Sequence, residues 1–213
     1  MELKEIAAAV EKGKAKQVKP LVNQALEEGY AVQDILNDGL ISAMGVVGEN
    51  FRENKIFVPE MLMAARAMTA GVSVLEPLMK QTGVKPIGTV VIGTVQGDLH
   101  DIGKNLVAMM LQGIGATVHD LGVDVPAKNF VTKAEEVGAD VVCLSALLTT
   151  TMPAIGDAIE EFRKAGVREK YYIMIGGAPV SQQFANEVGA DAYTSNASDA
   201  ANVAKAYLES KQG

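Results

Sequence analysis

The stretch Gly88-Thr-Val-Val-Ile-Gly-Thr-Val95, with Gly97-Asp-Leu-His-Asp-Ile-Gly-Lys104 shortly after it, decides the fold of this chain. The first part is an apolar run typical of a buried strand, and a helical pattern runs from Lys104 to Gln112. A histidine and two aspartates therefore lie on the connection between a strand and the next helix. In an open α/β sheet, this is the edge where ligands bind. The chain has only two histidines, so His100 is a candidate functional residue.

The alternation of strand and helix continues through the rest of the sequence. Because strands that alternate with helices form parallel sheets covered on both faces, we expect an α/β domain with a doubly wound parallel sheet. Five strands suit the flavodoxin-like, or Rossmann-like, order 2-1-3-4-5. The predicted strands are Thr89–Val95, Thr117–Leu121, Val141–Ser145, Tyr171–Ile175 and Ala192–Thr194.

The residues before this sheet have a helical pattern throughout. Apolar residues recur at helical spacing in four segments, of which the third is Val32–Phe51 and the fourth begins at Pro59, a favoured first residue of a helix. Four helices with short connections predict a small N-terminal four-helix bundle. The segment Thr82–Gly88 contains Gly and Pro and is the natural joint. We therefore expect a helical cap domain over residues 1–82, a joint over 83–88 and a Rossmann-like domain over 89–213.

Composition excludes several classes of function. The formal net charge of −7 argues against binding nucleic acid, which needs a cluster of excess basic residues. No apolar run reaches the roughly 18 residues of a membrane span, and the N-terminus lacks the basic-then-apolar order of a signal peptide. The single cysteine, Cys143, cannot form an internal disulfide. We therefore expect a cytoplasmic protein with no membrane and no nucleic-acid partner.

Three polar or glycine-rich segments follow the first, third and fourth predicted strands. Because the carboxyl ends of parallel strands share one edge, we expect the three segments to converge on one crevice. The patterns of several other sites are absent: no G-x-G-x-x-G after the first strand, no phosphate loop and no nucleophile elbow. Two histidines are also too few for a histidine-rich metal site. The three segments are Asp98–Gly103, Ser145–Thr151 and Gly176-Gly177.

His100 has two interpretations on local spacing. A single histidine with a carboxylate two residues away can give one axial bond to a metal whose other ligands come from a cofactor, while its second ring nitrogen donates to Asp98. Alternatively, Asp98 or Asp101 caps the next helix and the histidine faces solvent. Local spacing favours neither interpretation. The convergence of three segments favours the functional one.

Together these segments resemble a known family, the cobalamin-binding domains marked by D-x-H-x-x-G, then S-x-L, then G-G. The segment Phe57–Met68 resembles the part of the helical bundle that lies over the corrin in methyl-transferring members. The whole chain is similar to the small corrinoid proteins of methylamine, methanol, betaine and methoxyaromatic methyltransferase systems, and to the cobalamin-binding module of methionine synthase. The matching residues are Asp98, His100 and Gly103, then Ser145 and Leu147, then Gly176 and Gly177.

The resemblance implies a cobalamin cofactor and a role for each matched residue. His100 would replace the cofactor's own base as the lower cobalt ligand, and Asp98 would hydrogen-bond to His100. Thr151 would take the third relay position, where the family usually has a different hydroxyl residue, serine. Phe57 and Met61 would cap the upper face of the corrin. Further cofactor contacts would come from Asp101, which we also expect to have a local or capping role, and from Ile102, Gly103, Ser145, Leu147, Thr149, Gly176 and Gly177.

The resemblance implies a methyl carrier that catalyses nothing alone. A substrate-specific methyltransferase would load the methyl group onto cobalt, and a second methyltransferase would deliver it to tetrahydrofolate or coenzyme M. A reductive activating protein would restore oxidised cobalt, in the setting of anaerobic one-carbon metabolism. Three alternatives remain: the cobalamin subunit of a radical mutase, which usually lacks the preceding bundle; a cobalamin-sensing regulator, which needs a further module; and a cofactor-free interaction module.

Overall fold

The computed structural model describes residues 2–211, without the side chain of residue 80. The chain forms two compact units. The first, here called the helical unit, comprises the chain up to Pro86 together with Gly113–Gly115. The second, here called the sheet unit, comprises Ile87–Gln112 and the chain from Ala116 onward. The main division, between Pro86 and Ile87, falls within residues 83–88, where the sequence predicts a joint.

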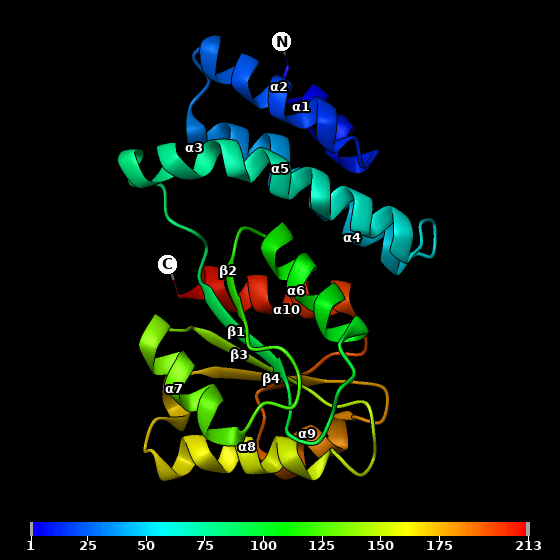
Figure 1. The fold of residues 1–213 in the computed structure, drawn as a ribbon, viewed down its shortest axis with the longest axis vertical. Coiled ribbons are helices and arrows are strands. Elements are labelled where there is room, and N and C mark those ends of the chain that lie inside the picture. The colour runs from blue at the N-terminus through cyan, green and yellow to red at the C-terminus, as the bar shows by residue number, and fades with distance from the viewer. Residues whose placement is uncertain (1, 212–213) are drawn as a thin grey trace. The chain divides into compact units, whose positions relative to one another are not determined.

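The helical unit is built from helices with short connections, as predicted (Figure 1). The predicted third helix is continuous but not uniform, because a π-helical stretch, η1, lies between two α-helical segments. The apolar pattern gives no sign of this change in winding. The elements are α1 (Leu3–Glu11), α2 (Ala15–Glu27), α3 (Val32–Asp34), η1 (Ile35–Ile41), α4 (Ser42–Arg52) and α5 (Val58–Thr82).

The core of the helical unit lies where α2 packs along α5. Gly71 of α5 is buried, and a Cβ at this position would lie 2.6 Å from the side chain of Leu40, so glycine permits close packing here. One stretch of the described chain, Val58–Met79 in α5, is long and apolar enough to cross a membrane, contrary to the expectation from the sequence. Its mean hydropathy is high because alanine and methionine fill the bundle face, and 39% of its most apolar window is buried inside the protein.

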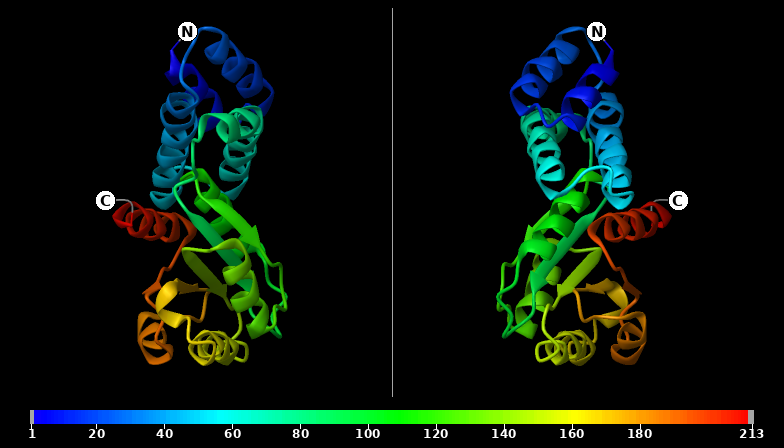
Figure 2. Two further views of the ribbon diagram at one scale, coloured as in Figure 1. Left: turned by 90° about the vertical axis from the view of Figure 1, so that its left-hand side faces the viewer. Right: turned by 90° about the vertical axis from the view of Figure 1, so that its right-hand side faces the viewer.

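The sheet unit contains a five-stranded parallel sheet in the order β2-β1-β3-β4-β5, which confirms the predicted order. Helices α6 and α10 cover one face, and α7, α8 and α9 cover the other (Figures 1 and 2). The strands are β1 (Thr89–Thr94), β2 (Thr117–Asp120), β3 (Val141–Ser145), β4 (Tyr172–Gly176) and β5 (Ala192–Tyr193). The helices are α6 (Ile102–Gly113), α7 (Ala127–Val137), α8 (Pro153–Lys164), the short 3₁₀ turn η2 (Arg168–Lys170), α9 (Gln182–Val188) and α10 (Ala197–Ser210).

The central strands are buried on both faces, as expected for a covered parallel sheet. Gly93 of β1 serves this packing, because a Cβ there would come within 2.7 Å of the ring of Phe130 on α7. Cys143 of β3 is buried, and burial raises the pKa of its thiol to about 12. Such a thiol stays protonated, so Cys143 is an inert core residue.

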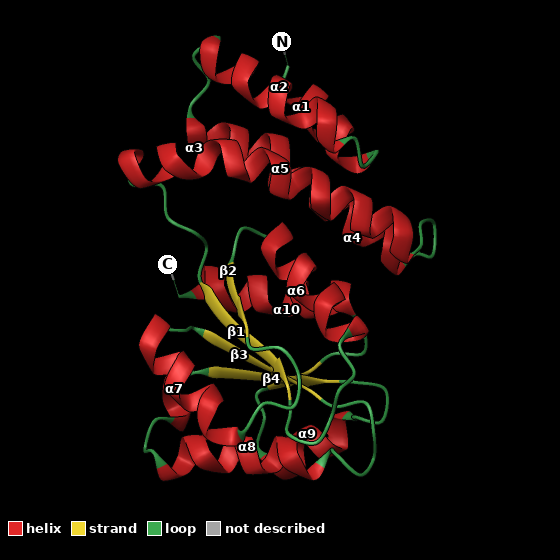
Figure 3. Cartoon of the chain, in the orientation of Figure 1, coloured by secondary structure: helices red, strands yellow, loops and turns green. Residues whose placement is uncertain are grey.

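The register of the sheet aligns the ends of three strands. Thr94 at the end of β1 pairs with Ser145 of β3, and Ser145 pairs with Gly176 of β4. The connections that follow these strands therefore begin side by side at one edge of the sheet, which is the edge where the loops gather in Figure 3. The predicted convergence of the three segments is confirmed.

Candidate functional site

The connection after β1 forms a tight turn that is fixed to the strand before it. Gly97 adopts a φ of 84°, a left-handed conformation that glycine takes without strain. Thr94 is fully buried, and its hydroxyl donates to the carbonyl oxygen of His100 over 2.8 Å. The backbone amide of Asp98 donates to the carbonyl of Val95 over 3.1 Å. The backbone on both sides of Leu99 is therefore held by β1.

Asp98 is the centre of the site, because its carboxylate is fully buried among four donors. The amide nitrogen and the ring Nδ1 of His100 lie 3.0 and 2.7 Å from Oδ1. The amide of Leu147 and the hydroxyl of Thr151 both donate to Oδ2 over 2.7 Å. Burial alone raises the pKa of Asp98, but the hydrogen bonds from Thr151, His100 and Leu147 together outweigh it. They hold this pKa well below its usual range.

His100 directs one ring nitrogen away from this network. Because the Asp98 carboxylate stays ionised, it can only accept, so Nδ1 of His100 carries the proton and donates. Nε2 is then left with a free lone pair, and 49% of the side chain is exposed. Within residues 2–211, Nε2 has no hydrogen-bond partner. This is the arrangement that metal-ligating histidines use, with one nitrogen bound to a carboxylate and the other facing the metal.

The site offers a metal a single protein ligand. Among the described residues, no group of three or more His, Cys, Asp or Glu side chains could hold a metal ion. A metal held by His100 would therefore take most of its other ligands from a cofactor or from water. Asp98 does not cap α6, because its carboxylate bonds only to His100, Leu147 and Thr151. Asp101 has the local role expected of it, since both its carbonyl and its carboxylate accept from Asn105.

Exposed apolar side chains surround this histidine. Leu99 and Ile102 flank it at 72% and 74% exposure, and Leu147 and Leu148 follow β3 at 40% and 42%. We call these four side chains the apolar rim. They are all the exposed large hydrophobic side chains among the described residues of the sheet unit. Exposed apolar side chains gathered in one region often mark a binding surface, and these four lie in the two connections that carry His100 and the donors to Asp98.

Two of the predicted site glycines, Gly103 and Gly177, have different surroundings. Gly177 has a φ of 130°, and a Cβ there would lie 1.8 Å from the carbonyl oxygen of Ala146, so the protein's own backbone requires glycine. At Gly103, nothing in the described chain lies within 4 Å of where a Cβ would be. A glycine in a helix lowers stability unless its space is needed. Among the described residues, nothing packs against Gly103 to require glycine there, whereas the close approach of Ala146 requires it at Gly177.

Comparison with known protein families identifies the ligand that this geometry suits. The model of a B12 binding domain matches residues 88–205, and the model of a second B12 binding domain matches residues 2–76. The chain belongs to the cobalamin-binding protein family. Both units of the structure are thus cobalamin-binding family domains.

Individual members of the family are similar along nearly the whole chain. Dimethylamine corrinoid protein 2 of Methanosarcina acetivorans is 47% identical over 210 residues, which is 98% of this chain and 97% of that protein. The structure of the methanol:cobalamin methyltransferase complex from Methanosarcina barkeri is 33% identical with a TM-score of 0.86, covering 96% of this chain and 78% of that chain. A cobalamin-binding protein from Desulfitobacterium hafniense DCB-2 is 30% identical with a TM-score of 0.80, covering 97% and 98%.

The residues present fit cobalamin, the cofactor of this family. A corrin would bring most of the ligands of its cobalt, and His100 is the residue that would add a nitrogen ligand from this chain. The apolar rim would suit the apolar surface of such a macrocycle, and no described residue fills the space beside Gly103. Ile102, Leu147 and the exposed Thr149 lie at this edge, as do Ser145 and Gly176 at their strand ends; their contacts with cobalamin stay predictions.

The two predicted cap residues of the helical unit differ in exposure. Phe57, at the start of α5, is 63% exposed and is available to a ligand. Met61 is fully buried, so the structure gives the prediction of a direct cofactor contact no support at this position. The reason is the helical repeat: Met61, Ala64, Ala65 and Met68 form the buried stripe of α5.

The sequence places Lys104 and Asp124 at this edge of the sheet but does not reveal which groups they bind. Lys104 is only 3% exposed, and its ammonium bonds to the carboxylate of Asp120 and, over 2.7 Å, to Asn105. A signal was available, because Lys104 lies four residues before the buried Ala108, on the inner stripe of α6. Asp124, in the connection after β2, hydrogen-bonds to the backbone of the Asp98 turn.

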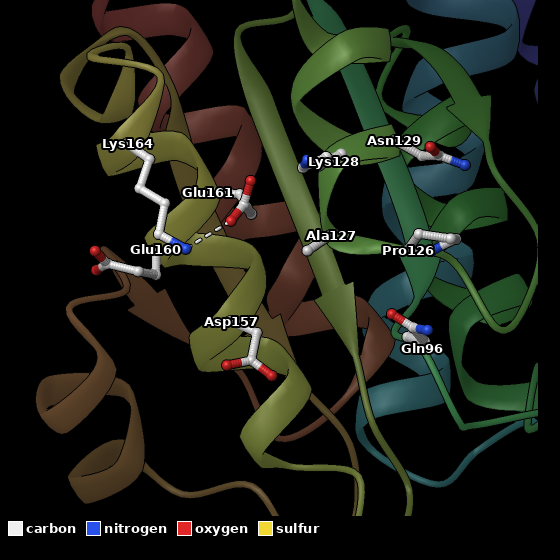
Figure 4. A pocket seen from close by; sticks show the side chains of 9 residues that line it. All are labelled: Gln96, Pro126, Ala127, Lys128, Asn129, Asp157, Glu160, Glu161 and Lys164. Carbon is white, nitrogen blue, oxygen red and sulfur yellow. Dashed lines mark hydrogen bonds and ion pairs between the residues drawn. The ribbon is translucent and has the colours of Figure 1, made fainter.

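A separate hollow of about 450 Å³ lies between the start of α7 and α8, with Gln96 at its rim (Figure 4). Its lining is mostly charged or polar, and the ammonium of Lys164 is paired there with Glu161 over 2.8 Å. None of the residues that surround His100 lines it. We therefore do not assign the cofactor to this hollow.

Proposed function

We propose that this chain carries a methyl group on the cobalt of bound cobalamin between two methyltransferases. The observation that carries the proposal is the hydrogen-bonded chain from Thr151 through Asp98 to His100, which ends at a free, exposed Nε2. When bound, cobalamin supplies a cobalt atom that takes up and gives up the methyl group. The relatives named as corrinoid proteins of methylamine systems support a carrier.

The residues of the site have distinct tasks in this function. His100 offers Nε2 to the lower face of the cofactor, and Asp98 keeps the proton on Nδ1 so that Nε2 remains a ligand. Thr151 and the amide of Leu147 occupy the second carboxylate oxygen, which fixes the plane of the carboxylate. The apolar rim would lie against the bound cofactor and limit the access of water to Nε2.

The partners follow from the named relatives. The donor enzyme is a methylamine methyltransferase, and dimethylamine is the first substrate to test, because relatives that are 44–51% identical to this chain are dimethylamine corrinoid proteins. The structure of a methanol:cobalamin methyltransferase complex supports docking to such an enzyme. A second methyltransferase, acting on tetrahydrofolate or coenzyme M, and a reductive activating protein complete the system in the cytoplasm.

The alternatives differ in what surrounds the shared motif. A radical mutase subunit would not need residues 2–76, which match a cobalamin-binding domain of their own. A sensing regulator needs a signalling module beside the two matched domains, and neither match provides one. The methyl carrier accounts for both units.

The test is reconstitution of the full chain with hydroxocobalamin, followed by reduction and addition of a dimethylamine-specific methyltransferase. We expect one cobalamin per chain, a visible spectrum with histidine bound to cobalt, and dimethylamine-dependent methylation of the cofactor. His100→Ala should retain cobalamin but lose the histidine-bound spectrum. His119→Ala is the matched control, because His119 lies in the edge strand β2 and should leave the spectrum unchanged. Failure of the chain to retain cobalamin, or identical spectra for wild type and His100→Ala, would exclude the proposal.

A further inference from the structure

The connection between β2 and α7 runs alongside the end of β1. The amide of Thr94 donates to the carbonyl of Gly122, and the amide of Val125 donates to the carbonyl of Thr94, each over 3.0 Å. Val95 and Val125 form a parallel bridge. This connection, residues 121–126, therefore extends the sheet beyond β2 to the turn that carries Asp98 and His100.

Within this connection, Asp124 contacts the turn twice. Its carboxylate Oδ1 accepts from the backbone amide of Gly97 over 2.7 Å, and its own amide donates to the carbonyl of Asp98 over 2.9 Å. The main chain of Asp98 is thus held on one side by Val95 and on the other by Asp124. Any movement of this backbone moves the carboxylate that orients His100.

The backbone of Asp124 is unusual for a residue with a side chain. Its φ is 51°, and only Asn54 among the other non-glycine residues described has a positive φ. Glycine adopts this conformation more easily, and Asn and Asp tolerate it. A strained conformation persists where the surroundings demand it. At this position the demand is for a side-chain acceptor, because the carboxylate takes the hydrogen bond of Gly97.

The far end of the same segment is tied to the same part of the chain. Lys104, in the first turn of α6, is buried and pairs with Asp120, the last residue of β2. The second oxygen of Asp120 accepts from the amide of Gly122 over 2.8 Å. Residues 97–104 are therefore anchored at both ends to residues 120–124, with His100 between the anchors.

We propose that Asp124 is a positioning residue, whose carboxylate holds the Gly97–Asp98 turn in the geometry that presents His100 to cobalt. The inference rests on the proposed function, because it concerns the same histidine. Asp124 acts through the backbone of Gly97 and Asp98 and needs no contact with the cofactor.

The experiment compares two substitutions that both suit a φ of 51°. Asp124→Gly removes the acceptor and relieves the backbone, whereas Asp124→Asn keeps an acceptor oxygen. Asn54→Gly is the matched control for placing glycine at a left-handed position. Hydrogen exchange of the Gly97 amide is measured in the apoprotein, and the fraction of histidine-bound cobalt is measured from the visible spectrum after loading with hydroxocobalamin.

For Asp124→Gly we expect the Gly97 amide to exchange about fivefold faster and the ratio of histidine-bound to unbound cobalt to fall about fivefold, the effect of losing one net hydrogen bond. Asp124→Asn should restore both values, and Asn54→Gly should change neither. A wild-type spectrum in Asp124→Gly overturns the inference even if exchange accelerates, and so does an Asp124→Asn variant as defective as Asp124→Gly. A failure of the proposed function is distinguishable, because the wild-type chain itself would then not hold cobalamin or would have the same spectrum as His100→Ala.

Discussion

The sheet unit and the helical unit both expose apolar side chains, but only one surrounds them with a buried polar network. All five buried polar or charged side chains among the described residues lie in the sheet unit, and four of them, Thr94, Asp98, Lys104 and Thr151, lie at the edge that carries His100. In the helical unit, the exposed Val46, Phe57 and Met63 have no such neighbours among the described side chains. Hydrogen bonds fix direction, whereas apolar contact does not.

This difference sets the size of the effect that each substitution should have. In the sheet unit, removal of one atom leaves a buried donor or acceptor without a partner, which is costly. In the helical unit, shortening an exposed side chain removes only apolar contact area, so the effect on stability or binding grows with the area removed. The five predictions below test this contrast, beginning with the residue that has the most hydrogen bonds.

Asp98→Asn should have the largest effect. An amide in place of the carboxylate presents an NH₂ group to at least one of the four donors, so a buried donor loses its acceptor. We expect the apoprotein to lose about 1–3 kcal/mol of unfolding free energy, measured by urea denaturation, and His100 to bind cobalt less often. Asp101→Asn, on the same turn but bonded only to Asn105, is the control and should be close to wild type.

The same pair of proteins gives a test by pH. Because the pKa of Asp98 is lower in the folded state, its ionised form stabilises the fold above the unfolded value of about 3.9, and this contribution is lost as the pH falls toward the folded value. The stability gap between wild type and Asp98→Asn should be constant near neutral pH and narrow on acidification below about pH 4. A gap that stays the same down to pH 2–3 would contradict an ionised, hydrogen-bonded Asp98.

Thr151→Val should have the next largest effect, because valine keeps the shape and removes only the hydroxyl. Oδ2 of Asp98 then keeps the amide of Leu147 as its donor, and we expect the unfolding free energy to fall by about 1 kcal/mol. We also expect a smaller fraction of histidine-bound cobalt in the visible spectrum. The control is Thr151→Ser, which keeps the hydroxyl and should recover most of the loss of histidine-bound cobalt. Equal spectra for the serine and valine variants would remove Thr151 from the network.

Much of the sheet unit could be predicted, and the reasons are local. A strand buried on both faces has an unbroken apolar run, so the limits of β3 were predicted to the residue and those of β1 and β4 to within one residue. The strand order followed from alternation alone. The π-helical stretch η1 was missed, because it preserves an apolar repeat while changing the winding of the backbone.

The site residues differ in how much of their role could be predicted from the sequence. The pairing of His100 with Asp98 follows from their separation in sequence, but the link from Asp98 to Thr151 spans 53 residues and came only from the family resemblance. The hydrogen bond from Gly97 to Asp124 could not be predicted, because it depends on a left-handed backbone that no residue pattern reveals. The contact of Met61 with the cofactor stays a prediction, because a methionine stripe looks alike whether it faces a ligand or a core.

Gly103→Ala should produce two small effects of opposite sign. Nothing lies within 4 Å of the new Cβ, so alanine should stabilise the apoprotein by about 0.5–1 kcal/mol through helix propensity. If the ligand needs this space, the affinity for hydroxocobalamin should fall in a binding titration. Gly45→Ala is the matched control, since Gly45 is also helical and equally open, and it should stabilise without changing affinity. Equal affinities for the two variants would show that Gly103 does not face the cofactor.

Phe57→Ala should have the smallest effect on folding and therefore reports most cleanly on the helical unit. The side chain is 63% exposed, so its removal should change the unfolding free energy by no more than about 0.5 kcal/mol. A contact with cobalamin would instead appear as faster oxidation of the reduced holoprotein in air, followed by its visible spectrum. Met63→Ala trims another exposed side chain of α5, 47% exposed, and should oxidise at the wild-type rate. If both variants oxidise at the same rate as wild type, neither exposed side chain protects the cofactor. Directional contacts from the sheet unit would then account for the site alone.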